Sequence, residues 1–115
     1  MKVLICGGRE YDNYRQMHEV LSLVWDMNGA ITCVIHGDAK GADFLARVWA
    51  KYNSIEQRPY PADWKNLGRG AGHARNQEML GELPDMVIAF PGGAGTADMV
   101  RRSKAANIHV HEVSQ

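Results

Sequence analysis

Residues that could do chemistry gather where apolar runs of this sequence end in glycine. The clearest case is the segment Pro91-Gly92-Gly93-Ala94-Gly95-Thr96-Ala97-Asp98, which directly follows the apolar run Met86–Phe90. A buried strand that breaks at glycine and then starts a helix turns several free backbone N–H groups toward one point, and such a point binds phosphate or another small anion. Glycine suits this position because a ligand oxygen reaches the backbone only where no side chain intervenes. Taken alone, the segment could equally be an ordinary strand-to-helix turn.

Two more glycine-rich turns follow apolar runs. Val3–Cys6 leads into Gly7-Gly8-Arg9-Glu10, and Ile31–Ile35 leads into the segment His36-Gly37-Asp38-Ala39-Lys40-Gly41-Ala42-Asp43. In an open parallel sheet the carboxyl ends of the strands share one edge, so we expect the three turns to converge on one crevice. We therefore predict a ligand site between the turns at Gly7–Arg9 and Gly92–Thr96, where the winding direction of the sheet reverses.

The composition limits the classes of protein to which the chain can belong. With 115 residues and 45% apolar content, residues 1–115 are expected to form one domain with a proper core. Thirteen basic and 13 acidic side chains cancel, so no overall field attracts nucleic acid or an anionic membrane. The amino-terminal apolar stretch is too short for a signal peptide, and no run is long enough to span a bilayer. We therefore expect a cytoplasmic protein.

The residues that most often bind metals are not clustered in the sequence. Cys6 and Cys33 fall inside apolar runs without a CxxC pattern, which indicates small buried apolar residues rather than a disulfide or a zinc site. His109 and His111 point the same way on an alternating strand over residues 108–113, but a third ligand is missing. We predict no metal and no cofactor.

The apolar periodicity predicts helices between these strands. One helix, capped by Asp12 or Asn13, should end near Asn28–Gly29, and another should start at Asp43 or the glycine before it and bury Trp49. Its apolar positions at helical spacing are Leu45, Val48, Trp49 and Tyr52.

The second half of the chain continues the alternation. Ile55–Tyr60 predicts an edge strand, because Pro59 cannot donate to a ladder, and residues 61–72 predict a long irregular segment. Helices are expected from about residue 70 to before Pro84 and over 95–106, on either side of the strand that ends at Phe90. This order predicts an α/β fold, a three-layer sandwich with a mostly parallel sheet of about five strands.

Five motifs in order resemble a known family. They are Gly8-Arg9, His36–Asp43, Pro61-Ala62-Asp63-Trp64, Arg75-Asn76 with Met79, and Pro91–Val100. With these motifs, which extend along nearly the whole chain, the sequence resembles the SLOG superfamily of Rossmann-like domains, most closely its short YspA-like branch from bacteria and phages. The resemblance implies a single Rossmann-like, SLOG-like domain that binds nucleotides or derivatives similar to NAD or ADP-ribose.

A catalytic branch of that superfamily, the LOG phosphoribohydrolases, cuts the N-glycosidic bond of a cytokinin nucleoside monophosphate. Its arginine is matched by Arg75, but the glutamate position of its Pro-Gly-Gly-x-Gly-Thr-x-x-Glu motif holds Met99. A thioether can neither act as a general base nor stabilise an oxocarbenium-like centre. The adjacent Asp98 is rotated by about 100° on a helix, although a bend at the amino end could still turn it to the crevice. Arg75 and Asp98 are therefore the catalytic candidates if the protein is an enzyme.

The candidate ligand-binding residues lie in the three turns and in the segment between the second and the third. They are Gly7, Gly8, Arg9, Gly37, Asp38, Gly41, Asp43, Trp64, Arg75, Asn76, Gly92, Gly93, Gly95, Thr96 and Asp98. We expect the last glycine-rich turn to hold a phosphate with its backbone N–H groups, and Arg75 to add a charge-assisted contact. The three aspartates could accept from ribose hydroxyls or cap helices, and Trp64 could cover a base or anchor its loop to the core.

Two classes of function remain open at this point. The sequence favours binding of a nucleotide or nucleotide-derived small molecule by a sensor, a carrier or a sequestering protein, because Met99 replaces a carboxylate. The alternative is a LOG-like nucleoside 5′-monophosphate phosphoribohydrolase, an N-glycosidic bond hydrolase. DNA binding is disfavoured by the zero net charge and the absence of a basic stripe. The expected partner is a nucleotide-derived small molecule rather than a membrane or a nucleic acid, and a homo-oligomer is left open.

Overall fold

The computed structural model describes residues 1–115 and contains one sheet of five parallel strands. Across the sheet the strands are β3 (Glu56–Pro59), β2 (Cys33–His36), β1 (Lys2–Cys6), β4 (Met86–Ala89) and β5 (Val110–Glu112). The chain winds from β1 outward to β3, then crosses back to β4 and continues to β5. The winding direction therefore reverses between β1 and β4, the strands predicted to flank this point.

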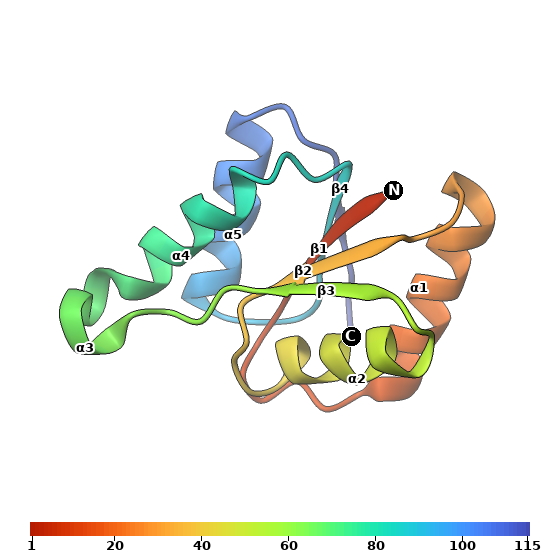
Figure 1. Ribbon diagram of the computed structural model, residues 1–115, viewed down its shortest axis with the longest axis horizontal. Helices are drawn as coiled ribbons and strands as arrows, with labels where there is room; N and C mark the ends of the chain where they lie inside the picture. The colour runs from red at the N-terminus through yellow and green to blue at the C-terminus, as the bar shows by residue number, and fades with distance from the viewer.

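Helices cover both faces of the sheet (Figure 1). Those on one face are α1 (Tyr14–Asn28) and α2 (Ala42–Tyr52), and those on the other are α4 (Ala71–Leu80) and α5 (Ala94–Ala105), which lie side by side. The short helix α3 (Trp64–Leu67) and a 3-10 turn (Gly68–Gly70) precede α4. This arrangement confirms the predicted three-layer, Rossmann-like α/β sandwich.

The core is divided by the sheet into two apolar layers. Val3 and Ile5 of β1 pack against α1 and α2, whereas Leu4 and Cys6, the residues between and after them, pack against α4 and α5. Side chains alternate between the faces of a strand, and a parallel sheet with both faces covered is apolar throughout. The run Val3–Cys6 is therefore a central strand, and both cysteines are buried and free, as predicted.

The outer strand β3 is held mainly by polar contacts. It pairs only with β2, and none of its residues is fully buried. Glu82, in the loop before β4, accepts hydrogen bonds from the Tyr60 hydroxyl at 2.6 Å and from Arg58 Nη1 at 2.5 Å. The prediction of an edge strand around Pro59 is confirmed. The Glu82 carboxylate joins this edge of the sheet to the loop that precedes β4.

Two local expectations were wrong. Residues 64–70 are helical rather than irregular, because Asp63 caps α3 by accepting the backbone N–H of Asn66 at 3.2 Å. Tyr52 is 86% exposed although its spacing placed it on the apolar face of α2, because it is the last helical residue and lies beyond the packed part of the helix. Trp49 is buried in the core, and the Asn13 side chain caps α1, as expected.

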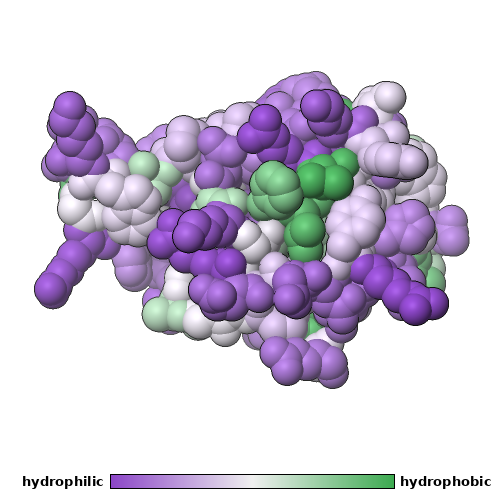
Figure 2. All heavy atoms as spheres, turned by 90° about the horizontal axis from the view of Figure 1, so that it is seen from below, coloured by the Kyte–Doolittle hydropathy of each residue, from purple (hydrophilic) through white to green (hydrophobic).

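The molecular surface is mainly polar on the side where α2 lies in Figure 1. Seen from below, polar side chains cover most of this face, and strongly apolar side chains gather near its middle (Figure 2). The largest exposed apolar side chains of α2 are Phe44 and Tyr52. No helix of the protein combines the length and the apolar character that a membrane span requires.

Candidate functional site

The three glycine-rich turns meet at the carboxyl edge of the sheet. The Gly8 N–H donates to the Pro91 carbonyl at 2.9 Å, which joins the turns that follow β1 and β4. The Ala42 N–H donates to the Gly8 carbonyl at 3.1 Å, which joins the start of α2 to the same point. Backbone hydrogen bonds therefore fix the three turns to one another. The Gly8 N–H donates to Pro91 and is not free to bind a ligand.

A cavity of about 650 Å³ opens between these turns and the α3–α4 segment. The predicted residues that line it are Gly7, Gly8, Arg9, Gly37, Asp38, Asp43, Trp64, Arg75, Asn76, Gly93, Gly95 and Thr96. Its size is within the range of about 300–1,000 Å³ that is typical of small-molecule sites. The structure thus brings most of the candidate residues to one cavity at the point where the winding of the sheet reverses.

The amino end of α5 forms one wall of this cavity. Gly93 precedes the helix, and no side chain caps its first N–H groups. The first turn of a helix leaves N–H groups without intrahelical acceptors, and the helix dipole adds a partial positive charge there. This wall can therefore accept an anion without any rearrangement of the backbone.

Arg75 crosses from α4 to the turn after β2. Its Nη1 donates to the Gly37 carbonyl at 2.7 Å, whereas its Nε is buried without an acceptor. Its Nη2 has no acceptor in the protein either. A side chain at position 37 would occupy the space of the guanidinium, so glycine at this position lets Arg75 reach the cavity wall. The guanidinium is thus anchored at one nitrogen and leaves donors for a further partner.

Asp43 is the most buried carboxylate of the cavity, with 8% of the residue exposed. Burial raises the pKa of its carboxyl group above the ordinary value, although the nearby charge of Arg75 partly opposes this shift. Its Oδ2 accepts the Ala39 N–H at 3.3 Å. Asp43 therefore holds the turn between β2 and α2 and also faces the cavity, so both roles considered for it are compatible.

Asp38 and Trp64 lie at the open side of the cavity. Asp38 adopts a positive φ of 54° and is 3.9 Å from Arg47 in an exposed ion pair. Trp64 is 51% exposed and lines the cavity, so it is not an anchor in the core. Its ring is available to a flat group bound in the cavity.

Three predicted residues do not line the cavity. Gly41 packs against the backbone of Gly8 and Arg9, and Gly92 packs against Gly8 and Thr96. Asp98 is turned into the contact between α4 and α5, where only 2% of it is exposed. Met99, at the glutamate position of the LOG motif, is completely buried in the core beneath α5. No carboxylate from this part of α5 faces the cavity.

Two further basic residues that were not predicted from the sequence, Arg69 and His73, also line the cavity. The signal for His73 was its position three residues before Asn76, because residues i and i+3 share one face of a helix. Cys6 also reaches the cavity, but burial raises the pKa of its thiol to about 12, so it remains protonated and unreactive. No group of three His, Cys, Asp or Glu side chains is placed to hold a metal ion.

Comparison with known proteins identifies the family of this chain. Residues 1–67 match YAcAr, the YspA, cpYpsA-related SLOG family. The Gene 61 protein of Mycobacterium phage D29 is 33% identical over 116 residues, which cover 95% of this chain and 93% of that protein. No solved structure matches the sequence. The motifs, the fold and both matches agree, and the chain belongs to the YspA, cpYpsA-related SLOG family.

Proposed function

We propose that the protein binds a nucleotide or a nucleotide-derived small molecule in the cavity between the three turns. Membership of the SLOG family suggests a nucleotide-related function. The observation that carries the proposal is the state of Arg75, whose guanidinium lines the cavity with one hydrogen bond to Gly37 and a buried Nε that has no acceptor. A phosphate group would provide acceptors for such a cation.

Arg75 and the amino end of α5 suit the same anion. A buried donor without an acceptor costs about 1–3 kcal/mol, and more when the group is charged, so a bound anion at Arg75 would relieve an existing cost. The uncapped N–H groups of Ala94, Gly95 and Thr96 supply neutral donors on the opposite wall. In this proposal the phosphate lies between Arg75 and the amino end of α5. The ribose lies near Asp43, and the base lies against Trp64.

Binding is favoured over LOG-type hydrolysis by the side chains of α5. Cleavage of the N-glycosidic bond leaves positive charge on the ribose, which a carboxylate in a water-poor site usually stabilises. Met99 is buried in the core, and Asp98 is buried and engaged in three hydrogen bonds with Asn76, Arg101 and Arg102. We therefore propose a sensor, a carrier or a sequestering protein.

Isothermal titration of adenosine monophosphate and ADP-ribose tests this function. The Arg75→Gln variant should bind about 10- to 100-fold more weakly, since a hydrogen bond to a charged group contributes about 1.5–3 kcal/mol. Arg15→Gln is the matched control, because Arg15 is an exposed residue of α1 that pairs only with Glu19. Chromatography of the same mixtures should show no free adenine. Absence of binding to the native protein, or equal binding by Arg75→Gln, would overturn the proposal.

A further inference from the structure

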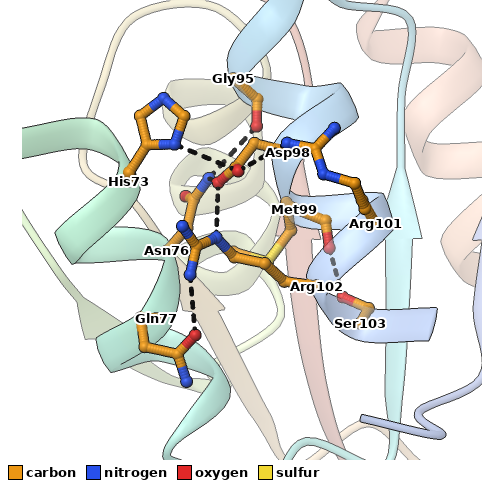
Figure 3. Close-up of polar contacts among 9 residues, drawn as sticks. All are labelled: His73, Asn76, Gln77, Gly95, Asp98, Met99, Arg101, Arg102 and Ser103. Atoms are coloured by element: carbon orange, nitrogen blue, oxygen red, sulfur yellow. Dashed lines mark hydrogen bonds and ion pairs between the residues drawn. The ribbon is translucent and has the colours of Figure 1, made fainter. Parts of the chain in front are cut away.

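Next to the cavity, a buried carboxylate holds a histidine. Asp98 of α5 accepts three hydrogen bonds and makes one ion-pair contact, with His73 (Figure 3). Asn76 Nδ2 and Arg102 Nε lie 3.1 and 2.8 Å from its Oδ2, and Arg101 Nη2 and His73 Nδ1 lie 2.9 and 3.1 Å from its Oδ1. A carboxylate has about four lone-pair sites, and three of them are taken by the hydrogen bonds from Asn76, Arg101 and Arg102.

Asp98 is fixed in place and permanently ionised near neutral pH. Its side chain is only 3% exposed. Burial acts to raise its pKa, but the hydrogen bonds from Asn76 and Arg102 and the charges of Arg102 and His73 outweigh burial and lower that pKa below the usual value. His73 Nδ1 lies 3.1 Å from this carboxylate, whose negative charge attracts an N–H on that nitrogen. The contact with Asp98 therefore holds the His73 ring at the edge of the α4–α5 packing.

His73 is the member of this cluster that also lines the cavity. Its side chain is 58% exposed, and Nε2, the ring nitrogen turned away from Asp98 in Figure 3, has no acceptor in the protein. The ring is held at one end by a buried anion and is free at the other, an arrangement that orients the free nitrogen. Arg69, also at the cavity, is not tied to any carboxylate in this way.

We infer that His73 is a second ligand-contacting residue of this site, that its Nε2–H donates to a phosphate oxygen of the bound nucleotide, and that Asp98 is its positioning residue. This inference rests on the proposed function. Donation from both ring nitrogens makes the ring an imidazolium between two anions. Arg101 and Arg102 of α5, Arg75 of α4, and Arg69 oppose that charge, and the phosphate and Asp98 favour it. The ligand class is a phosphate ester of a nucleoside. Binding of the uncharged nucleoside should not depend on His73.

Titrations with adenosine monophosphate and with adenosine test this inference. The His73→Gln variant should bind adenosine monophosphate about tenfold more weakly than the native protein and should bind adenosine equally well. His18→Gln is the matched control, because His18 is an exposed residue of α1 outside the cavity. In imidazole ¹H–¹⁵N spectra of the native protein, adenosine monophosphate should shift the Nε2 signal of His73, and adenosine should not.

The role of Asp98 is tested through His73. Asp98→Asn should weaken binding of adenosine monophosphate, and addition of His73→Gln to that variant should weaken it little further, because both changes remove one contact. If Asp98→Asn does not fold, the imidazole spectrum of the native protein still tests the contact of His73: an Nε2 signal that adenosine monophosphate does not shift would overturn the inference. Weak binding by Arg75→Gln with native-like binding by His73→Gln would overturn this inference and leave the proposed function intact. A native protein that binds no nucleotide overturns both.

Discussion

Two aspartates with similar sequence settings have different environments. Asp43 and Asp98 both follow glycine-rich turns, but Asp43 lies in the first turn of α2 whereas Asp98 lies beyond the first turn of α5. Burial raises the pKa of Asp43, whereas hydrogen bonds and nearby charges hold the pKa of Asp98 down despite its burial. The difference comes from Asn76 of α4, which donates to Asp98, and from Arg102, which follows Asp98 by four residues and so lies on the same helix face. This spacing could have been recognised in the sequence.

Asp98→Asn should destabilise the protein by about 1.5–3 kcal/mol at pH 7, because it weakens hydrogen bonds between an ion and two guanidinium groups. The folded-state pKa of Asp98 is below its unfolded value, so its contribution is present above pH 4 or so and is lost as the pH falls through the folded pKa. The free energies of unfolding of the two proteins should therefore converge at acidic pH. Urea unfolding at pH 7 and pH 3 measures this.

A control variant separates this effect from a general loss of negative charge. Asp26 is an exposed residue of α1 without an ion pair, and Asp26→Asn should leave the free energy of unfolding nearly unchanged at both pH values. If Asp98→Asn is as stable as Asp26→Asn at pH 7, the cluster in Figure 3 does not stabilise the packing of α4 on α5.

At the scale of elements, the strands, the longer helices and the convergence of the turns could be predicted from hydrophobic periodicity and from the residues of the turns. The buried runs Val3–Cys6 and Met86–Phe90 gave central strands, since no other element of this length buries both faces. Convergence of the turns followed from parallel pairing at one sheet edge. Helix α3 was missed because four residues cannot show a 3.6-residue period, and its Asp63 cap was not recognised. The exclusion of Asp98 from the cavity depends on side-chain partners that periodicity does not specify.

Close contact between the β1 turn and the α2 turn depends on Gly41. This residue has φ 74° and ψ −126°, and an added Cβ would lie 2.6 Å from the Arg9 carbonyl oxygen. Gly41→Ala should therefore destabilise the protein beyond the roughly 1–3 kcal/mol expected for backbone strain alone. Urea unfolding gives the value. The backbone has no flexible side chain that could move to relieve the collision.

Gly68 offers a matched control for that substitution. It has φ 55° and ψ −129°, close to the values of Gly41, but nothing lies within 4 Å of an added Cβ. Gly68→Ala should therefore lower the free energy of unfolding only by the cost of backbone strain. If the two alanine variants lose the same free energy of unfolding, contact between the turns contributes nothing beyond conformational strain.

At the scale of the whole molecule, the cavity joins the two helical layers. Arg75 belongs to the layer of α4 and α5, whereas the Gly37 carbonyl that it contacts leads into α2 of the other layer. The layers otherwise share the sheet, with separate apolar clusters on its two faces. A ligand that contacts Arg75, the α5 amino end and the β2–α2 turn would therefore touch both layers at once.

Because a single domain of this size usually unfolds in one cooperative step, a ligand at this junction should stabilise both layers equally. At an adenosine monophosphate concentration of about 100 times the Kd, the gain is about 2.7 kcal/mol, which slows amide exchange through global unfolding about 100-fold. Amides of β1 and β4 that exchange only by global unfolding should slow by this factor in hydrogen exchange measured by mass spectrometry or NMR. Arg75→Gln at the same concentration should slow exchange only about 2- to 11-fold, because its binding is about 10- to 100-fold weaker. If only the turns around the cavity slow while β1 and β4 exchange as before, the ligand acts locally and the layers do not unfold as one unit.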